Sequence, residues 1–236
     1  MGLACHNYND VNLKLPAAFN GRVTTTKKNG NVFYFILPYM EQDALYNSTN
    51  DPVDDLSVPA LPAGQQNYVR AQLVKAFLCP SATISPDGRW FGTDWATGHY
   101  GFNYMVFGSP TTDSGGANPP WDRKLSVATI RDGTSNTVLF AERSGLFSNN
   151  TGNLWLHGGW NSNYMPMFGY NGNYQVFQQR PTQAQSTPFV TQSPHGSVMN
   201  TCLADGSVRG VSSSVSQPTW QNAIIPDDGN VLGSDW

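Results

Sequence analysis

Charge is the scarcest feature of this sequence of 236 residues. Only 12% of the residues are Asp, Glu, Lys or Arg, which is about half of the roughly 25% usual for soluble domains. The net charge is −3, and the Lys27-Lys28 doublet stands in a polar stretch that predicts a loop tip. Because a nucleic-acid groove needs clustered Lys and Arg, the sequence argues against nucleic acid as a partner. A neutral polar surface of this kind suits extracellular proteins and tightly packed assemblies.

Cysteine is also scarce, with Cys5, Cys79 and Cys202 as the three examples. None of them forms a CxxC pair, and this absence argues against a zinc site. At most one disulfide can form. Two alternatives stay open: a Cys79–Cys202 disulfide, or three small, buried, apolar side chains.

Long hydrophobic runs are absent from the sequence. No stretch approaches the roughly 20 apolar residues that a membrane-spanning helix needs, and no signal peptide is present. We therefore expect a chain that is either cytoplasmic or the part left after such a segment has been removed.

Apolar residues are nevertheless abundant enough for a core, since 39% of the chain is hydrophobic and 12% is aromatic. Residues 2–12 have helical spacing and no N-cap, so they predict the last turns of a longer helix that stops near Asn12 and Pro16. Residues 32–37 form a continuous apolar run that predicts a buried strand. Pro38 then predicts the first turn of a short helix over residues 39–47.

The remaining segments predict mainly strands. Residues 87–95 and 99–108 are aromatic strand candidates, residues 74–79 are expected to be extended, and residues 137–142 predict a strand after a turn at Asp132-Gly133. The C-terminal part, 195–233, predicts a hairpin and a short helix that begins after Pro218. The fold class is therefore α+β, with one sheet system, long decorated loops and a single domain over residues 1–236.

His195 and Asp205-Gly206 raise the question of a catalytic dyad. Asp-Gly favours a two-residue type I′ turn, which would place Ala204 opposite Ser207 and Leu203 opposite Val208. At about 3.3 Å per strand residue, His195 would then lie on the order of 30 Å from Asp205. We therefore expect an architectural hairpin, in which the His195 ring bonds the backbone near Pro194, and we predict no catalytic residues.

His195 is followed by nine residues and then by Asp205-Gly206. This spacing is similar to the C-terminal signature of the bacterial prepilin-like H-x9-DG family, a domain of unknown function. The segments "GLACHNYNDVNLKLP", "ILPYMEQDALYN", "FLCPS", "IRDGTSNTVLFAE" and "ADGSVRGVSSSVSQPTWQNAI" also resemble blocks of that family, in the same order. The resemblance extends from about residue 2 to about residue 233. Cys5 and the aromatic segment around 153–178 depart from the family pattern.

The resemblance implies a type IV pilin-like or pseudopilin-like architecture. A truncated N-terminal helix, with residues 1–12 as the C-terminal end of its spine, would pack on an antiparallel sheet. Members of this family are exported, cleaved by a prepilin peptidase and presented in the bacterial envelope or at the cell surface. Membrane anchoring would depend on an N-terminal hydrophobic helix that this sequence does not contain. The implied partners are further copies of the chain in a filament, or envelope and secretion-system proteins.

Metal binding is a further possibility raised by single residues. Asp132, Asp205 and Asp228 each precede a glycine and are candidate calcium ligands, although Asp-Gly pairs more commonly mark turns stabilised by local hydrogen bonds. We therefore favour turns and expect no cofactor. The other histidines, His6, His99 and His157, show no paired spacing, so a metal cluster would have to be drawn from several loops.

Aromatic side chains suggest the candidate binding surface. Trp155, Trp160, Tyr164, Tyr170 and Tyr174 stand among many Asn and Gly residues, and they suit either a subunit interface or the stacking of sugar rings. We expect a structural, non-enzymatic protein that acts by self-assembly or partner contact, with an extracellular carbohydrate-binding module as the alternative. Glu142, at the end of a predicted strand, is expected to pair with Arg131 or Arg143.

Overall fold

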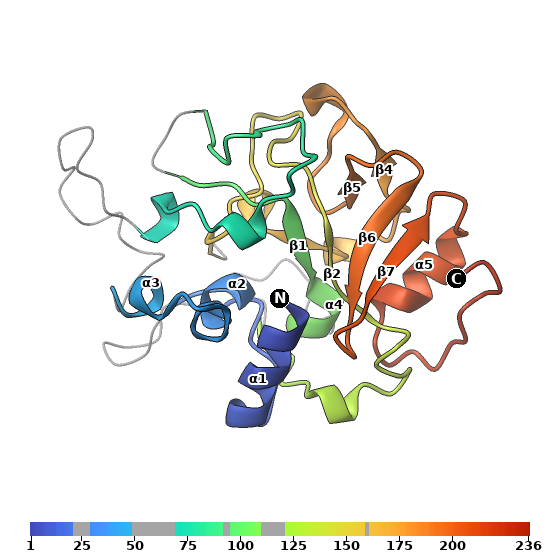
Figure 1. Ribbon diagram of the computed structural model, residues 1–236. Coiled ribbons are helices and arrows are strands. Elements are labelled where there is room, and N and C mark those ends of the chain that lie inside the picture. The colour runs from blue at the N-terminus through green and yellow to red at the C-terminus, as the bar shows by residue number, and fades with distance from the viewer. Residues whose placement is uncertain (21–28, 49–68, 92–94, 110–120, 159–160) are drawn as a thin grey trace, which may run out of the picture.

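A five-stranded sheet organises the fold. The computed structural model describes residues 1–20, 29–48, 69–91, 95–109, 121–158 and 161–236 (Figure 1). The strand order is β3-β1-β2-β6-β7, and all neighbours are antiparallel except β1 and β3, which run parallel. The strands are β3 (Met167–Phe168), β1 (Tyr100–Asn103), β2 (Val138–Glu142), β6 (Val198–Leu203) and β7 (Val208–Ser212). A separate parallel pair is formed by β4 (Gln178–Gln179) and β5 (Gln192–Ser193).

Helices are few and short, as the sequence predicts. The α-helices are α1 (Gly2–Asn12), α2 (Val32–Phe35), α3 (Asp43–Asn47), α4 (Tyr104–Phe107) and α5 (Gln217–Ile224). Short 3₁₀ turns are η1 (Leu37–Met40), η3 (Val69–Ala71), η4 (Lys75–Phe77), η6 (Val127–Thr129), η7 (Ser162–Tyr164), η8 (Tyr170–Gly172) and η9 (Gln183–Gln185). In the part of the chain that the structure describes, no helix is both long and apolar enough to cross a bilayer.

Helix α1 packs against the tip of the C-terminal hairpin. A Cβ atom on Gly2 would lie 2.5 Å from Cys202 Sγ and 3.2 Å from the Gly206 Cα atom, so only glycine allows this approach. Ala4 and Cys5 of the same helix are also buried. In Figure 1, α1 lies at the lower edge of the view, the β4–β5 pair near the upper edge, and α5 beside β7 on the right.

The core is one hydrophobic cluster that includes residues from Ala4 to Ile224. The Phe33 ring stands near its centre, with ring centroids 4.7 Å from Phe77 and 5.7 Å from Phe140. Trp220 of α5 stacks on Phe168 of β3 at 6.3 Å. The first, middle and last parts of the sequence therefore pack on the same sheet.

The strand predicted over residues 32–37 is wrong, because Val32–Phe35 is helix α2. The Asn31 side chain accepts a hydrogen bond from the Tyr34 amide and caps this helix. All residues of the run are buried, and a run buried on every side has no periodicity to distinguish strand from helix. Residues 75–77 likewise form η4 rather than an extended segment, and α4 replaces the second half of the strand expected over 99–108. Residues 87–95 contribute one isolated bridge, Arg89–Ala96, among the described residues.

The predicted C-terminal hairpin is confirmed as β6 and β7, but its turn differs by one residue. Cys202 lies opposite Val208, and the Leu203 amide donates to the Ser207 carbonyl at 2.9 Å. The Gly206 amide donates to the Leu203 carbonyl at 2.9 Å, and Gly206 has a φ of 86°. This is a three-residue loop ending in a glycine bulge. It needs one positive φ, at the glycine, whereas a type I′ turn would also need one at Asp205.

Candidate functional site

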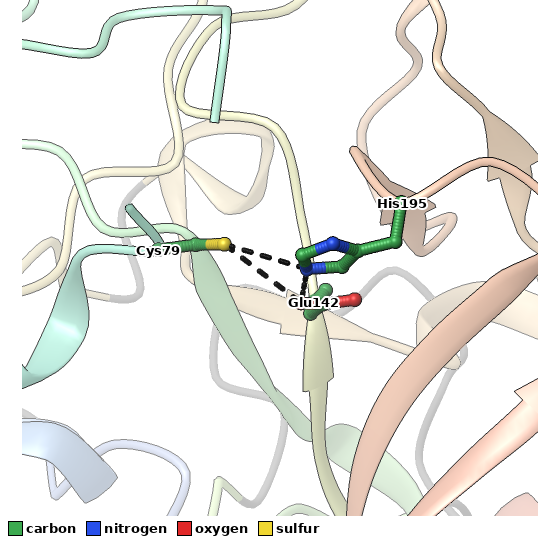
Figure 2. A group of neighbouring side chains, drawn as sticks. All are labelled: Cys79, Glu142 and His195. Atoms are coloured by element: carbon green, nitrogen blue, oxygen red, sulfur yellow. Dashed lines mark hydrogen bonds and ion pairs between the residues drawn. The ribbon is translucent and has the colours of Figure 1, made fainter. Parts of the chain in front are cut away.

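Cys79, Glu142 and His195 bring a sulfur, an oxygen and a nitrogen atom to one point of the molecule (Figure 2). His195 Nε2 lies 2.9 Å from Glu142 Oε1 and 3.7 Å from Cys79 Sγ. Cys79 Sγ lies 3.9 Å from the same Glu142 oxygen. Among the described residues, this is the one group of three or more His, Cys, Asp or Glu side chains whose ligand atoms lie within 4.8 Å of one another.

Each of the three side chains comes from a different part of the fold. Glu142 is the last residue of β2, directly opposite Tyr100 on β1. Cys79 follows η4, and its amide donates to His99 Nδ1 at 3.1 Å. His195 lies in the turn between β5 and β6, where its amide donates to Ser193 Oγ at 3.0 Å. A strand, a loop and a turn thus meet at the end of the sheet.

The Glu142 carboxylate is held firmly from the neighbouring strand β6. The Asn200 amide donates to Oε2 at 2.9 Å, and Asn200 Nδ2 donates to Oε1 at 3.1 Å. The Glu142 side chain is 2% exposed, whereas that of His195 is 33% exposed. A buried carboxylate needs such donors to offset its loss of hydration. The predicted pairing of Glu142 with Arg131 or Arg143 is wrong, because its carboxylate instead contacts His195, Asn200 and Cys79.

Burial controls the protonation of the neighbouring thiol and phenol. It raises the pKa of the Cys79 thiol, and the nearby Glu142 carboxylate raises it further. Burial also raises the pKa of Tyr100 to about 12, with Cys79 and Glu142 as the next causes. At neutral pH, both groups therefore carry their protons. A protonated thiol is a weak nucleophile, so the surroundings of Cys79 do not activate it.

The arrangement also differs from a nucleophilic triad. In a triad, the histidine faces the nucleophile with one ring nitrogen and the acid with the other. Here the same nitrogen, Nε2, faces both Cys79 Sγ and Glu142 Oε1. A proton cannot be relayed through the ring in this geometry. The three atoms instead all lie close to one common point, which is the arrangement that a metal ion needs.

A small, partly enclosed pocket adjoins the group. Its walls include Cys79, His99, Ser144, Gln192 and Ser193. His99 is buried, and burial lowers its pKa. Its Nδ1 accepts from the Cys79 amide, and its Nε2 lies 3.1 Å from the Ser85 carbonyl oxygen. The ring is therefore neutral with its hydrogen on Nε2, and it fixes the backbone of Cys79.

His195 is thus placed differently from its prediction. Its ring meets Glu142, while the Pro194 carbonyl accepts from Arg180 Nε at 3.3 Å. Asp205 stands beyond the other end of β6, where its Oδ1 accepts from the Ser207 amide and hydroxyl. These local bonds lower the pKa of Asp205. The expectation that His195 and Asp205 form no dyad agrees with these contacts.

The three candidate calcium ligands do not gather around a common point. Asp132 accepts from the Asp228 and Gly229 amides, both at 2.9 Å. Asp228 Oδ1 accepts from the Asn230 amide at 2.8 Å, and Asp205 is occupied by Ser207. The Asp205 and Asp228 carboxylates therefore stabilise their own turns, as expected, whereas the Asp132 carboxylate stabilises the distant turn at Asp228-Gly229.

The predicted Cys79–Cys202 disulfide is not formed, because all three cysteines are free. Cys202 lies on β6 against Gly2 of α1, whereas Cys79 belongs to the group with Glu142 and His195. Cys5 is buried in the core. The alternative of small buried side chains fits Cys5, but Cys79 has polar partners.

The aromatic surface is only partly exposed. Trp155 is buried, and its Nε1 donates to the Gln72 carbonyl at 3.0 Å, so it cannot stack on a ligand. Tyr164 stacks on His157, Tyr170 packs edge-on against Tyr104, and the Tyr174 hydroxyl contacts Met105 Sδ. Trp160 lies outside the described residues.

Two members of the group, Cys79 and Glu142, were not predicted to share a site with His195. The available signal was that each of the three lies in a segment that carries the resemblance: "FLCPS", "IRDGTSNTVLFAE" and the His195 to Gly206 signature. A model of a family described as a protein of unknown function (DUF1559) matches residues 1–217. No curated protein and no solved structure matches the chain.

Proposed function

We propose that this chain, which belongs to the DUF1559 family of proteins of unknown function, is a structural subunit of the bacterial cell envelope or surface. It acts without catalysis, in the manner of a pilin or pseudopilin, by assembling with further copies of itself. The observation that carries the proposal is that large apolar side chains are exposed on the outer side of α1 and directly after it. Leu3 and Val11 on this helix are exposed by 73% and 71%, and Leu13, which directly follows it, is exposed by 83%.

The inner side of α1 is fixed to the rest of the molecule. Ala4 and Cys5 are buried, His6 Nε2 lies 2.9 Å from the Ala204 carbonyl oxygen, and Asn9 Oδ1 accepts from the Val127 amide at 3.1 Å. The apolar residues on its outer side are therefore presented by an anchored helix. In a pilin-like assembly, the helices of neighbouring subunits pack against one another, and such a surface would serve that purpose.

The concentration of apolar exposure at α1 favours an interface over chance. The described residues contain eight large, exposed hydrophobic side chains, and three of them belong to residues 1–13. Single exposed apolar residues are normal, whereas a gathering of them marks a contact site. The low charge of the chain, 12%, further favours close approach of identical subunits.

The experiment is to compare the association of charge variants by analytical ultracentrifugation and negative-stain electron microscopy of the full-length, processed protein. Leu3→Asp and Val11→Lys replace side chains that are mostly exposed, so α1 should stay folded. We expect this double variant to weaken self-association at least about 10-fold, which corresponds to about 1.4 kcal/mol.

The matched control is Val231→Asp with Val198→Lys, which adds the same charges at exposed side chains outside α1, with exposed fractions of 88% and 41%. This control should assemble like the parent protein. A parent protein that stays monomeric at every concentration would contradict the proposal. So would a control that loses assembly as completely as the α1 variant.

A further inference from the structure

We infer that Cys79, Glu142 and His195 bind one divalent transition-metal ion of the zinc class, through Sγ, Oε1 and Nε2. The inference rests on the convergence of three different ligand atoms from a loop, a strand and a turn (Figure 2). It is independent of the proposed assembly through α1, since none of the three residues lies on that helix.

The spacing of the ligand atoms suits such an ion. Zinc binds sulfur at about 2.3 Å and nitrogen or oxygen at about 2.0–2.2 Å, so its tetrahedral ligands lie about 3.4–3.6 Å apart. The observed separations are 2.9 Å for His195–Glu142, 3.7 Å for Cys79–His195 and 3.9 Å for Cys79–Glu142. Movements of about half an ångström or less would bring each pair to the tetrahedral separation.

The chemistry of the donors selects the class of ion. A cysteine sulfur is a soft ligand that hard ions such as calcium and magnesium avoid, whereas zinc and its transition-metal neighbours take sulfur, imidazole and carboxylate together. The three protein ligands leave a fourth position for water or another molecule. This is a metal site built from three separate segments, which the absence of a CxxC pair in the sequence does not exclude.

The residues behind the ligands already hold them in place. Asn200 fixes both Glu142 oxygens from β6, Ser193 Oγ holds the His195 backbone, and His99 holds the Cys79 backbone. Such supporting contacts orient metal ligands and reduce the cost of ordering them. The partly exposed His195 ring gives the ion a route of entry from solvent.

Binding changes the protons of two ligands. The Cys79 thiol releases its proton to solvent and binds as the thiolate, and the His195 ring binds through the Nε2 lone pair with its remaining hydrogen on Nδ1. Glu142 binds as the carboxylate. The ion would then join segments that are 116 residues apart in the sequence, so it would also stabilise the fold.

The test uses the purified full chain, treated with a chelator and titrated with Co²⁺, which reports a cysteine ligand by its sulfur-to-metal charge-transfer absorption. We expect one equivalent of Co²⁺ to produce this band, and Zn²⁺ to displace it. Zn²⁺ should also raise the melting temperature. Cys79→Ser should abolish the band, and His195→Gln should weaken binding at least about 100-fold.

Cys202→Ser is the matched control, because Cys202 is a free cysteine that does not belong to the group, and it should bind like the parent. Circular dichroism checks that each variant is folded, and His195→Gln, at a partly exposed position, keeps the test valid if Cys79→Ser does not fold. Binding without the charge-transfer band, binding unchanged by both Cys79→Ser and His195→Gln, or no binding at all would each overturn the inference.

Discussion

At the scale of single residues, Leu13 has an unfavourable backbone conformation. It ends α1 with φ 59° and ψ 17°, in the left-handed region, where a residue with a Cβ atom loses roughly 1–2 kcal/mol. Glycine is the usual residue at this position after a helix. We predict that Leu13→Gly raises the free energy of unfolding by about 0.5–1 kcal/mol, since the greater freedom of glycine in the unfolded chain offsets part of the gain.

Urea denaturation followed by circular dichroism would measure this change. Leu3→Gly is the matched control, because Leu3 is also a largely exposed leucine, but lies inside α1. There, glycine should lower stability by about 0.5–1 kcal/mol. If both glycine variants were destabilised to the same extent, the strain attributed to Leu13 would be wrong.

The sequence singles out individual residues of the candidate site but does not predict that they meet. His195 stands out because of its spacing from Asp205-Gly206, and Glu142 ends a strand that the sequence predicts. Their meeting depends on the pairing of β2 with β6, which places Glu142 beside Asn200 and, through the turn before β6, beside His195. Local patterns do not specify which strands pair. Cys79, which is 116 residues from His195, carries even less local information about its partners.

At the scale of elements, prediction succeeded where a local signal marks an end. Helix α5 is capped by Ser216, with Pro218 in its first turn. The β6–β7 hairpin is marked by its Asp-Gly pair, and β2 follows the Asp132-Gly133 turn. Prediction failed for α2, because its ends are set by tertiary contacts. The Asn31 side chain donates to the carbonyls of Trp155 and His157, more than 120 residues away.

Asn31 therefore does more than cap a short helix, and its replacement should be costly. It is fully buried, its Oδ1 accepts from the Tyr34 amide, and its Nδ2 donates to the Trp155 carbonyl at 2.8 Å. Asn31→Ala removes the cap and leaves buried carbonyl groups without a donor. We predict a loss of about 2–4 kcal/mol in the free energy of unfolding, the sum of these effects, measurable by urea denaturation.

The comparison for this variant is Asn161→Ala. Asn161 is an exposed residue whose side chain caps η7 by accepting from the Asn163 amide at 3.2 Å. Water can replace that bond, so the loss should stay below about 1 kcal/mol. Similar losses for the two variants would mean that the long-range bonds of Asn31 contribute little.

At the scale of the whole molecule, all parts of the chain share one core, so a change at one buried residue affects the stability of the entire fold. Buried histidines therefore make the free energy of unfolding depend on pH. The His157 ring is enclosed between Trp95 and Tyr164, with centroid distances of 5.3 and 5.2 Å. Burial lowers the pKa of His157 to about 4 from the usual 6.5. Burial also lowers the pKa of His99. As the pH falls, the unfolded chain therefore takes up these protons before the folded chain does.

The sign of the effect follows from this order of protonation. The contribution of His157 to stability is complete above about pH 6.5 and is lost as the pH falls towards about 4, at about 1.4 kcal/mol per pH unit for one proton.

We predict that His157→Phe, which keeps a ring between Trp95 and Tyr164, removes that share of the pH dependence. It should also lower stability at pH 8 by about 1 kcal/mol, since the bond to the Gly158 carbonyl is lost. Urea denaturation at pH 8, 6 and 5 measures both quantities. Parallel pH profiles for the parent and the variant would show that His157 is not the group that titrates, because the lost hydrogen bond shifts the profile without changing its slope.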